Sequence, residues 1–187
     1  MNSEYEIKFY IDVEKIQQCL KKLEAKLVQK DTLMKRWIFT FFDKPNQWVR
    51  VRDEGDRVTT TLKLFDGQQN IESVKEVEMV VSDFNAAFTI FSKLKFDTSR
   101  YVENYREVWA IENCYIMVDR YPALDTFVEI EGSSKEVVLA LVNQLGLDVS
   151  KGVYGPTALL YQEKYKISRS DFEAIEKITF ANNPFNN

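Results

Sequence analysis

A strictly alternating stretch, Glu4-Tyr5-Glu6-Ile7-Lys8-Phe9, lies near the N-terminus and predicts a β-strand over Glu4–Ile11. Successive side chains of a strand point to opposite faces of the sheet. This strand would therefore carry Glu4, Glu6 and Lys8 on one face and apolar side chains on the other. The apolar face needs a covering layer, and the charged face needs water or a charged ligand.

Seven further segments have the alternation, or the β-branched and aromatic content, that is typical of strands. Polar turns at Glu54-Gly55-Asp56 and Asp66-Gly67 join some of them closely, which predicts hairpins and a largely antiparallel sheet. The seven segments are Lys35–Phe42, Gln47–Arg52, Arg57–Phe65, Ser73–Val81, Arg100–Ile111, Tyr115–Arg120 and Thr126–Glu131.

Apolar residues at helical spacing predict three helices, and one or two more are expected between Thr157 and Ile178. The stripes cover Val13–Leu27, Phe84–Leu94 and Val137–Leu145. Their expected N-caps are Asp12, Ser82 or Asp83, and Ser133 or Ser134, and Gly146 would close the third helix. We therefore expect an α+β fold in which helices cover the apolar faces of the strands.

Length and composition predict a single domain over residues 1–187, with a flexible tail from about residue 180. The net charge of -4 argues against a nonspecific nucleic-acid binder, because such proteins usually carry a basic footprint. The sequence has no apolar leader and no apolar run of the roughly 20 residues that a membrane span needs. We expect a cytoplasmic protein with no membrane partner, whose oligomeric state the sequence leaves open.

The chain contains no histidine, which excludes Ser-His-Asp and Cys-His catalysis and argues against a zinc site. Its two cysteines, Cys19 and Cys114, lack a metal-type spacing and are expected to be reduced thiols. Any catalysis must therefore rely on carboxylates, Lys, Arg, Tyr or a hard metal ion.

Like-charged residues recur two apart on the expected strands, always opposite an apolar face. For any one strand the ordinary interpretation is a solvated face. Several such pairs together indicate a divided site instead, because paired carboxylates repel unless a cation lies between them and paired arginines need an anion. The pairs are Glu4/Glu6, Glu76/Glu78 and Glu129/Glu131 for the acids and Arg50/Arg52 for the bases, with Lys63 in phase with Thr61 and Thr59.

This division suits a triphosphate, which carries roughly four negative charges and is bound by Arg forks and Lys point charges. Mg²⁺ or Mn²⁺ would bridge carboxylates to phosphate oxygens. A sheet closed into a barrel would let opposing walls serve one site. Arg106 and Asp119 are further candidates on strands whose phase the pattern leaves open.

The motifs resemble the CYTH domain, or triphosphate tunnel metalloenzyme, superfamily over about Ser3 to Tyr165. Glu4-Tyr5-Glu6-Ile7-Lys8 is similar to its E-x-E-x-K signature. The later motifs follow in the family's order: Val49-Arg50-Val51-Arg52 (L-R-x-R), Thr61-Leu62-Lys63 (T-x-K), Lys75-Glu76-Val77-Glu78 (an acidic strand), Tyr105-Arg106-Glu107 (a basic strand), and Val118-Asp119, Leu124 and Phe127-Val128-Glu129-Ile130-Glu131 (D…L…F-x-E-x-E).

The resemblance implies a tunnel of eight antiparallel strands with helices outside, and it implies roles for individual residues. Glu4, Glu6, Lys8 and Lys63 would be catalytic. The implied metal ligands are Glu4, Glu6, Glu129 and Glu131, with Glu78 as a helper, and the implied phosphate ligands are Lys8, Arg50, Arg52, Lys63 and Arg106. Glu76, Asp119 and Lys164 are further candidates, Lys164 as a cap on the tunnel.

The resemblance leaves several functions open. Metal-dependent hydrolysis of inorganic or small organic triphosphate leads, and class IV adenylyl cyclase chemistry and a non-catalytic polyphosphate or nucleotide-binding module are the alternatives. A lipocalin-like carrier is disfavoured because its lumen would be apolar. Two departures bear on the choice: Asn104 stands where the family commonly has a second basic residue, and the His-Phe pair of family cyclases is missing.

Overall fold

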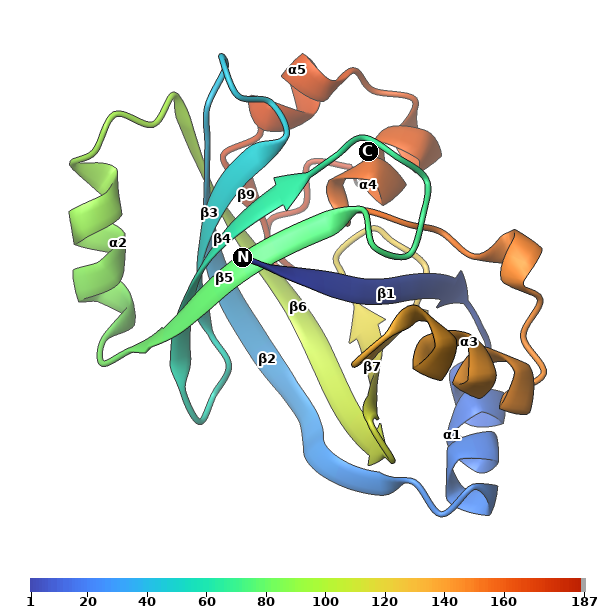
Figure 1. Cartoon of the computed structure of the whole chain (residues 1–187). Coiled ribbons are helices and arrows are strands. Elements are labelled where there is room, and N and C mark those ends of the chain that lie inside the picture. The colour runs from blue at the N-terminus through green and yellow to red at the C-terminus, as the bar shows by residue number, and fades with distance from the viewer. Residues whose placement is uncertain (186–187) are drawn as a thin grey trace.

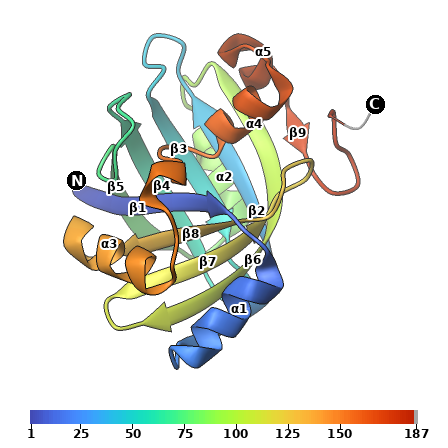
Figure 2. The same cartoon turned by 90° about the vertical axis from the view of Figure 1, so that its right-hand side faces the viewer.

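The computed structural model describes residues 1–185, in which eight antiparallel strands close into a barrel. The strand order is β2-β3-β4-β5-β1-β8-β7-β6, and β6 pairs with β2 to close it. The predicted α+β fold with a closed antiparallel barrel is confirmed (Figures 1 and 2). The strands are β1 Asn2–Tyr10, β2 Lys26–Thr40, β3 Gln47–Asp53, β4 Val58–Phe65, β5 Val74–Val81, β6 Thr98–Ile111, β7 Cys114–Arg120 and β8 Phe127–Gly132. A short strand, β9 Lys177–Ile178, adds in parallel to β6.

Helices pack on the outside of the barrel and across one of its ends. Figure 1 shows α2 on one side, α1 and α3 on another, and α4 and α5 at the end that is uppermost in the view. No helix within residues 1–185 is long and apolar enough to cross a membrane. The helices are α1 Val13–Lys22, α2 Phe84–Ser92, α3 Lys135–Gln144, α4 Ala158–Tyr165 and α5 Arg169–Glu173, with a 3-10 turn at Val149–Lys151.

The largest apolar cluster lies between the outer face of the barrel and helices α1 and α3. Ile7 of β1 and Ile130 of β8 are fully buried there against Ile16 and Leu20 of α1 and Val138 of α3. Burial of each such side chain contributes about 1.5–3 kcal/mol. The apolar alternates of β1 and β8 therefore anchor the helices, which leaves their charged alternates to face inward.

A second cluster lies under α2 and explains why β2 is rich in aromatic residues. Trp37 stacks on Phe88 of α2 with ring centroids 4.3 Å apart, and Phe39 packs against the same helix. Asp83 caps α2 by accepting a hydrogen bond from the Ala86 backbone N–H. Asp12 and Ser134 cap α1 and α3 in the same way, so each of these three helices begins at a predicted N-cap.

The prediction that the first helix reaches Leu27 is wrong. Helix α1 ends at Lys22, Glu24 takes a left-handed conformation with φ 56°, and the Ala25 N–H returns to the Leu20 carbonyl at 2.9 Å. Leu27 belongs instead to β2, opposite Trp109 of β6. Pairing of β2 with β6 over most of their lengths outweighs the local helical spacing of the apolar residues.

The described part of the C-terminal tail packs against the protein. Phe185 stacks on Tyr165 and Tyr161 of α4, with ring centroids 4.3 Å and 5.1 Å away. The sequence pattern did not indicate this aromatic contact, and the flexibility of the tail from about residue 180 stays a prediction. Asn186 and Asn187 lie outside the described residues.

Candidate functional site

The inward faces of the barrel strands enclose a cavity of about 660 Å³. Adjacent strands pair in register, so the alternating charged residues of separate segments come to face one space. The predicted site residues that line it are Glu4, Glu6, Lys8, Arg50, Arg52, Lys63, Glu76, Glu78, Arg106, Glu129 and Glu131. The structure thus brings the like-charged pairs together, and the chemical role of each residue stays a prediction.

One side of the cavity is an acidic wall, formed by Glu4 and Glu6 of β1 and by Glu129 and Glu131 of β8. The two strands are neighbours, with Glu6 opposite Glu131 and Lys8 opposite Glu129. The Lys8 ammonium lies 2.6 Å from a Glu6 oxygen and 4.0 Å from Glu129. Lys8 therefore compensates part of the negative charge from within the wall.

Lys63 of β4 reaches the same wall from the opposite side of β5. Its Nζ donates hydrogen bonds to both Glu4 oxygens at 2.6 and 2.7 Å and lies 3.1 Å from Glu76. Burial acts to lower the pKa of Lys63, but Glu4 and then Glu6 outweigh it and the pKa is raised. Lys63 is a buried, fixed positive charge.

Three carboxylates of the acidic wall converge on one point. Each of Glu4, Glu129 and Glu131 offers an oxygen within 4.8 Å of the other two. Burial, followed by repulsion from Glu4 and Glu129, raises the pKa of Glu131 to about 7. Hard oxygen donors that repel one another fit Mg²⁺ or Mn²⁺, which neutralises such groups and takes carboxylate ligands.

The pKa values of Glu6 and Glu129 are shifted in opposite directions although the two carboxyl groups interact. Burial raises the pKa of Glu6 well above its ordinary value, with Lys8 opposing the shift. Burial also acts to raise the pKa of Glu129, but Lys8 and Arg106 outweigh it and hold that pKa well below its ordinary value. The surroundings of Glu129 thus favour its charged form, which is the form that a metal ligand needs.

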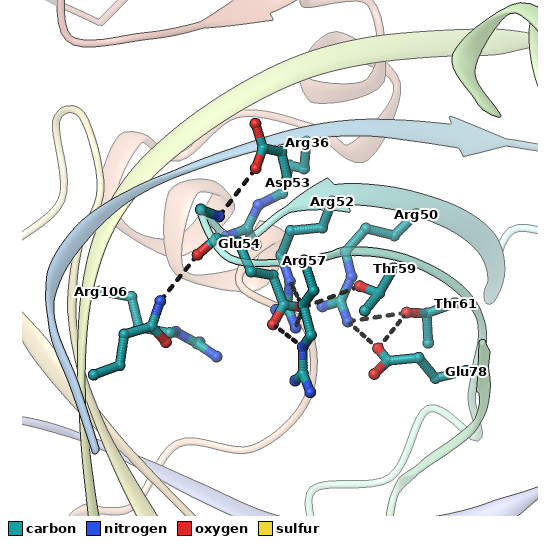
Figure 3. Close-up of polar contacts among 12 residues, drawn as sticks. Arg36, Arg50, Arg52, Asp53, Glu54, Arg57, Thr59, Thr61, Glu78 and Arg106 are labelled. Atoms are coloured by element: carbon teal, nitrogen blue, oxygen red, sulfur yellow. Dashed lines mark hydrogen bonds and ion pairs between the residues drawn. The ribbon is translucent and has the colours of Figure 1, made fainter. Parts of the chain in front are cut away.

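The opposite side of the cavity is a cationic wall, formed by Arg50 and Arg52 of β3 and Arg106 of β6. In Figure 3, Arg50 points toward Thr61 and Glu78, whose oxygens lie 3.1 and 3.3 Å from its Nη2. Glu78 therefore contacts an arginine and lies outside the group of three converging carboxylates.

Arg52 is held by Glu54, a residue that directly follows β3. Arg52 donates to Glu54 Oε1 from Nε at 2.8 Å and from Nη2 at 2.5 Å, and Arg57 and Thr59 also donate to Glu54 (Figure 3). Burial alone would raise the pKa of Glu54, but these partners, Arg52 foremost, lower it to about 2. Glu54 stays ionised and fixes the Arg52 fork.

Arg106 is held from behind by Asp119 of β7. Its Nε and Nη2 donate to the two Asp119 oxygens at 2.8 and 2.6 Å, and Nη2 also lies 3.1 Å from Glu129, so Arg106 adjoins the acidic wall. Asp119 is fully buried behind the guanidinium and does not line the cavity. It is a positioning residue for Arg106.

Sequence reasoning missed three buried charged residues that line the cavity: Arg36, Glu54 and Arg100. A signal for Glu54 was present, since it continues the two-residue period of Arg50 and Arg52 into the turn. A signal for Arg36 was also present, because it alternates with Trp37 on the predicted strand. Arg36 has no charged residue two positions away, so it does not belong to a like-charged pair.

Two other candidates take unexpected places. Lys164 lies 2.9 Å from Asp125 and does not line the cavity, and its role as a cap on the tunnel stays a prediction. Asn104, the departure from the family's basic position, is fully buried and donates to Asp119 at 2.8 Å.

Comparison with known proteins agrees with this geometry. The CYTH domain family matches residues 2–155 of the chain. This chain belongs to the CYTH domain family. The family contains triphosphatases and proteins named as adenylyl cyclases; CYTH enzymes act on triphosphates and depend on a metal.

Individual relatives are distant in sequence. A protein of Methanocaldococcus jannaschii named "Putative adenylate cyclase" is 28% identical over 138 residues, which span 72% of this chain and 79% of that protein. A conserved protein of Pyrococcus furiosus has the same fold, with a TM-score of 0.71, 24% identity, and coverage of 84% of this chain and 99% of its own. The Hippeastrum protein HpAC1, described as having a dominant triphosphatase activity, is 14% identical, with a TM-score of 0.58 and coverage of 90% and 98%.

Proposed function

We propose that this CYTH protein is a metal-dependent triphosphatase that hydrolyses inorganic triphosphate or a small organic triphosphate inside the barrel. The observation that carries the proposal is the division of one cavity. Three converging carboxylates, Glu4, Glu129 and Glu131, and a set of guanidiniums line the same cavity of about 660 Å³. This arrangement supplies a cation site and an anion site within reach of one extended ligand.

In this proposal the cationic wall binds and orients the phosphates. Arg50, Arg52 and Arg106 are each held by an acidic residue, so their forks are fixed before the ligand enters. Pre-organised donors stabilise charge as it develops on the transferred phosphoryl group without a cost of reorganisation. Lys8 and Lys63 add point charges close to the acidic wall.

The acidic wall would hold Mg²⁺ or Mn²⁺ through Glu4, Glu129 and Glu131, with Glu6 beside them. Such a cation supplies positive charge to phosphate oxygens and makes water more acidic. The chain's own residues keep the carboxylates close, buried and, at Glu129, ionised. Hydrolysis then needs no histidine, in agreement with a chain that has none.

In the proposed reaction a water oxygen forms a bond to the terminal phosphorus and the bond from that phosphorus to the bridging oxygen breaks. Diphosphate, or an organic diphosphate, leaves from the cationic wall. The proton of the attacking water passes to a carboxylate of the acidic wall. The products are orthophosphate and the shortened anion.

The second candidate is an adenylyl cyclase, which the name of the Methanocaldococcus jannaschii relative supports. A cyclase must also hold a nucleoside. The cavity extends to Trp48, Phe65 and Leu159 near α4, where Phe65 and Leu159 both approach Gly155. Aromatic and aliphatic surface of this kind can accept a base, so the cyclase stays open.

The deciding experiment offers the purified protein tripolyphosphate, ATP or thiamine triphosphate with Mg²⁺ or Mn²⁺. Orthophosphate release from tripolyphosphate or thiamine triphosphate is the expected result. Cyclic AMP and pyrophosphate from ATP would establish the cyclase instead. Binding without any product would leave a polyphosphate- or nucleotide-binding module and would refute the triphosphatase.

A further inference from the structure

Arg36 is a buried arginine that the charge pattern did not include. It lies on β2 with its side chain in the cavity, and only 6% of the residue is exposed. Its outward neighbour Trp37 packs under α2, so the alternation of β2 fixes Arg36 in the inward direction. It pairs with Arg52 on the neighbouring strand β3, and both residues are labelled in Figure 3.

The partners of Arg36 are neutral, unlike those of the other arginines of the cationic wall. Its Nη1 donates to Tyr121 Oη at 2.7 Å, and its Nη2 donates to Asn104 Oδ1. The guanidinium carbon lies 5.2 Å from the centre of the Tyr121 ring. Among residues 1–185, no carboxylate lies within ion-pair distance of Arg36, and its buried Nε has no hydrogen-bond partner.

Like charge surrounds Arg36. It lies directly opposite Arg52 in the β2–β3 register, and such pairs destabilise a sheet. Burial lowers the pKa of Arg36, and the nearby Arg52 and Arg106 lower it further, although Tyr121 and, more weakly, Asp119 act to raise it. A buried charge without an ion-pair partner destabilises the folded protein. An anion bound beside Arg36 would remove this cost.

Asn104 explains why Asp119 does not serve as that counter-ion. Both Asp119 oxygens accept hydrogen bonds from Arg106, and the Asn104 amide also donates to Asp119 at 2.8 Å. The Asn104 carbonyl oxygen turns to the other side and accepts from Arg36. The amide therefore lies between Asp119 and Arg36, orients the guanidinium and leaves it without a direct ion pair to Asp119.

We propose that Arg36 is a phosphate-binding residue of this cavity and supplies the positive charge that Asn104 lacks. The inference rests on the proposed function only in taking a triphosphate as the ligand. Tyr121 and Asn104 are positioning residues for the guanidinium, and the ligand's phosphate oxygens take the place of the missing carboxylate.

Binding is measured by calorimetry with imidotriphosphate, a non-hydrolysable analogue, and Mg²⁺. We expect Arg36→Gln to weaken binding about 10- to 100-fold, since it removes a charge-assisted fork from a desolvated site. Arg36→Lys should give an intermediate affinity. The double variant Arg36→Gln/Asn104→Lys places a positive charge at position 104 instead and should recover most of the lost affinity. The matched control is Arg120→Gln, which removes one positive charge at an exposed pair with Asp31 and should bind as the wild type does.

A structural role alone predicts a different pattern. Arg36→Gln would then lower the melting temperature while the folded protein keeps an affinity within twofold of the wild type, and that result overturns the proposal. If Arg36→Gln does not fold, an Arg36→Lys affinity equal to that of the wild type together with no gain from Asn104→Lys overturns it as well. Absence of binding by the wild type also contradicts it.

The same data separate this inference from the proposed function. Binding that depends on Arg36, without orthophosphate release from tripolyphosphate, removes only the hydrolase. Release of orthophosphate with an unchanged KM and affinity in Arg36→Gln removes only the role of Arg36.

Discussion

The two faces of the barrel carry opposite kinds of residues, although they belong to the same strands. On β1, Ile7 points outward and is fully buried beneath α1 and α3, and its neighbour Lys8 points inward among carboxylates. The outer face thus holds the helices, and the inner face holds charges that would repel without a ligand or a compensating partner. One residue step along a strand separates stability from function.

The largest effect that follows from this difference is on activity. Glu4→Gln removes a charge from the three converging carboxylates at nearly constant shape, and we expect at least a ~100-fold loss of orthophosphate release. The melting temperature should change little, because Lys63 keeps Glu76 at 3.1 Å and Glu131 loses a repelling neighbour. Activity of Glu4→Gln near that of the wild type would remove Glu4 from the metal site.

The adjacent outward position should give the reverse pattern. Ile7→Ala leaves a cavity in the cluster under α1 and α3 and should cost about 3 kcal/mol of unfolding free energy. For a domain of this size that corresponds to a fall of about 10 °C in melting temperature. The turnover of the folded protein, assayed well below the melting point, should stay within twofold of the wild type. A large loss of turnover without a loss of stability would contradict the claim that the outward face serves the fold and the inward face serves the reaction.

Metal addition tests the inner face without a substitution. A cation that binds only the folded protein raises its stability by about 2.7 kcal/mol at 100 times its dissociation constant. We expect Mg²⁺ or Mn²⁺ to raise the melting temperature and EDTA to reverse the change. The Glu131→Gln variant, which keeps only two of the three carboxylates, should show a smaller rise. An equal rise in both proteins would place the cation elsewhere.

Glu54 is a charge of the inner face that should also stabilise the fold. Its pKa in the folded protein is about 2, below the ordinary 4.5, so its contribution is complete above about pH 4.5 and is lost as the pH falls toward 2. At about 1.4 kcal/mol per pKa unit, the difference between 4.5 and about 2 corresponds to an effect on the order of 3 kcal/mol. Urea unfolding between pH 7 and pH 3 should show Glu54→Gln less stable at pH 7 and less sensitive to acid. Parallel curves for the two proteins would contradict this.

Much of the fold and site could be predicted from the sequence, because the same alternation of charged and apolar residues indicates both the strands and the charged face. The two-residue period of Glu4/Glu6, Arg50/Arg52 and Glu129/Glu131 marks the strands and assigns their charged residues to one face. The helix N-caps Asp12, Asp83 and Ser134 were also predictable, because each accepts a hydrogen bond from a backbone N–H only two or three residues further on.

Other features depend on contacts between distant segments, which the pattern does not contain. The boundary near Leu27 is set by β6, some eighty residues further on. The convergence of Glu4 with Glu129 and Glu131 depends on the β1–β8 register, and the neutral surroundings of Arg36 depend on which side of Asn104 faces it. Register and side-chain orientation of this kind follow from closure of the barrel.

The central claim is that the charged pairs form one site for a cation and a triphosphate inside the barrel. Its most direct test is a crystal structure with Mn²⁺ and imidotriphosphate, in which anomalous scattering locates the metal. We predict a manganese peak between Glu4, Glu129 and Glu131, with the phosphates against Arg50, Arg52 and Arg106. Manganese and phosphates bound on the outer surface, with the cavity filled only by water, would contradict it.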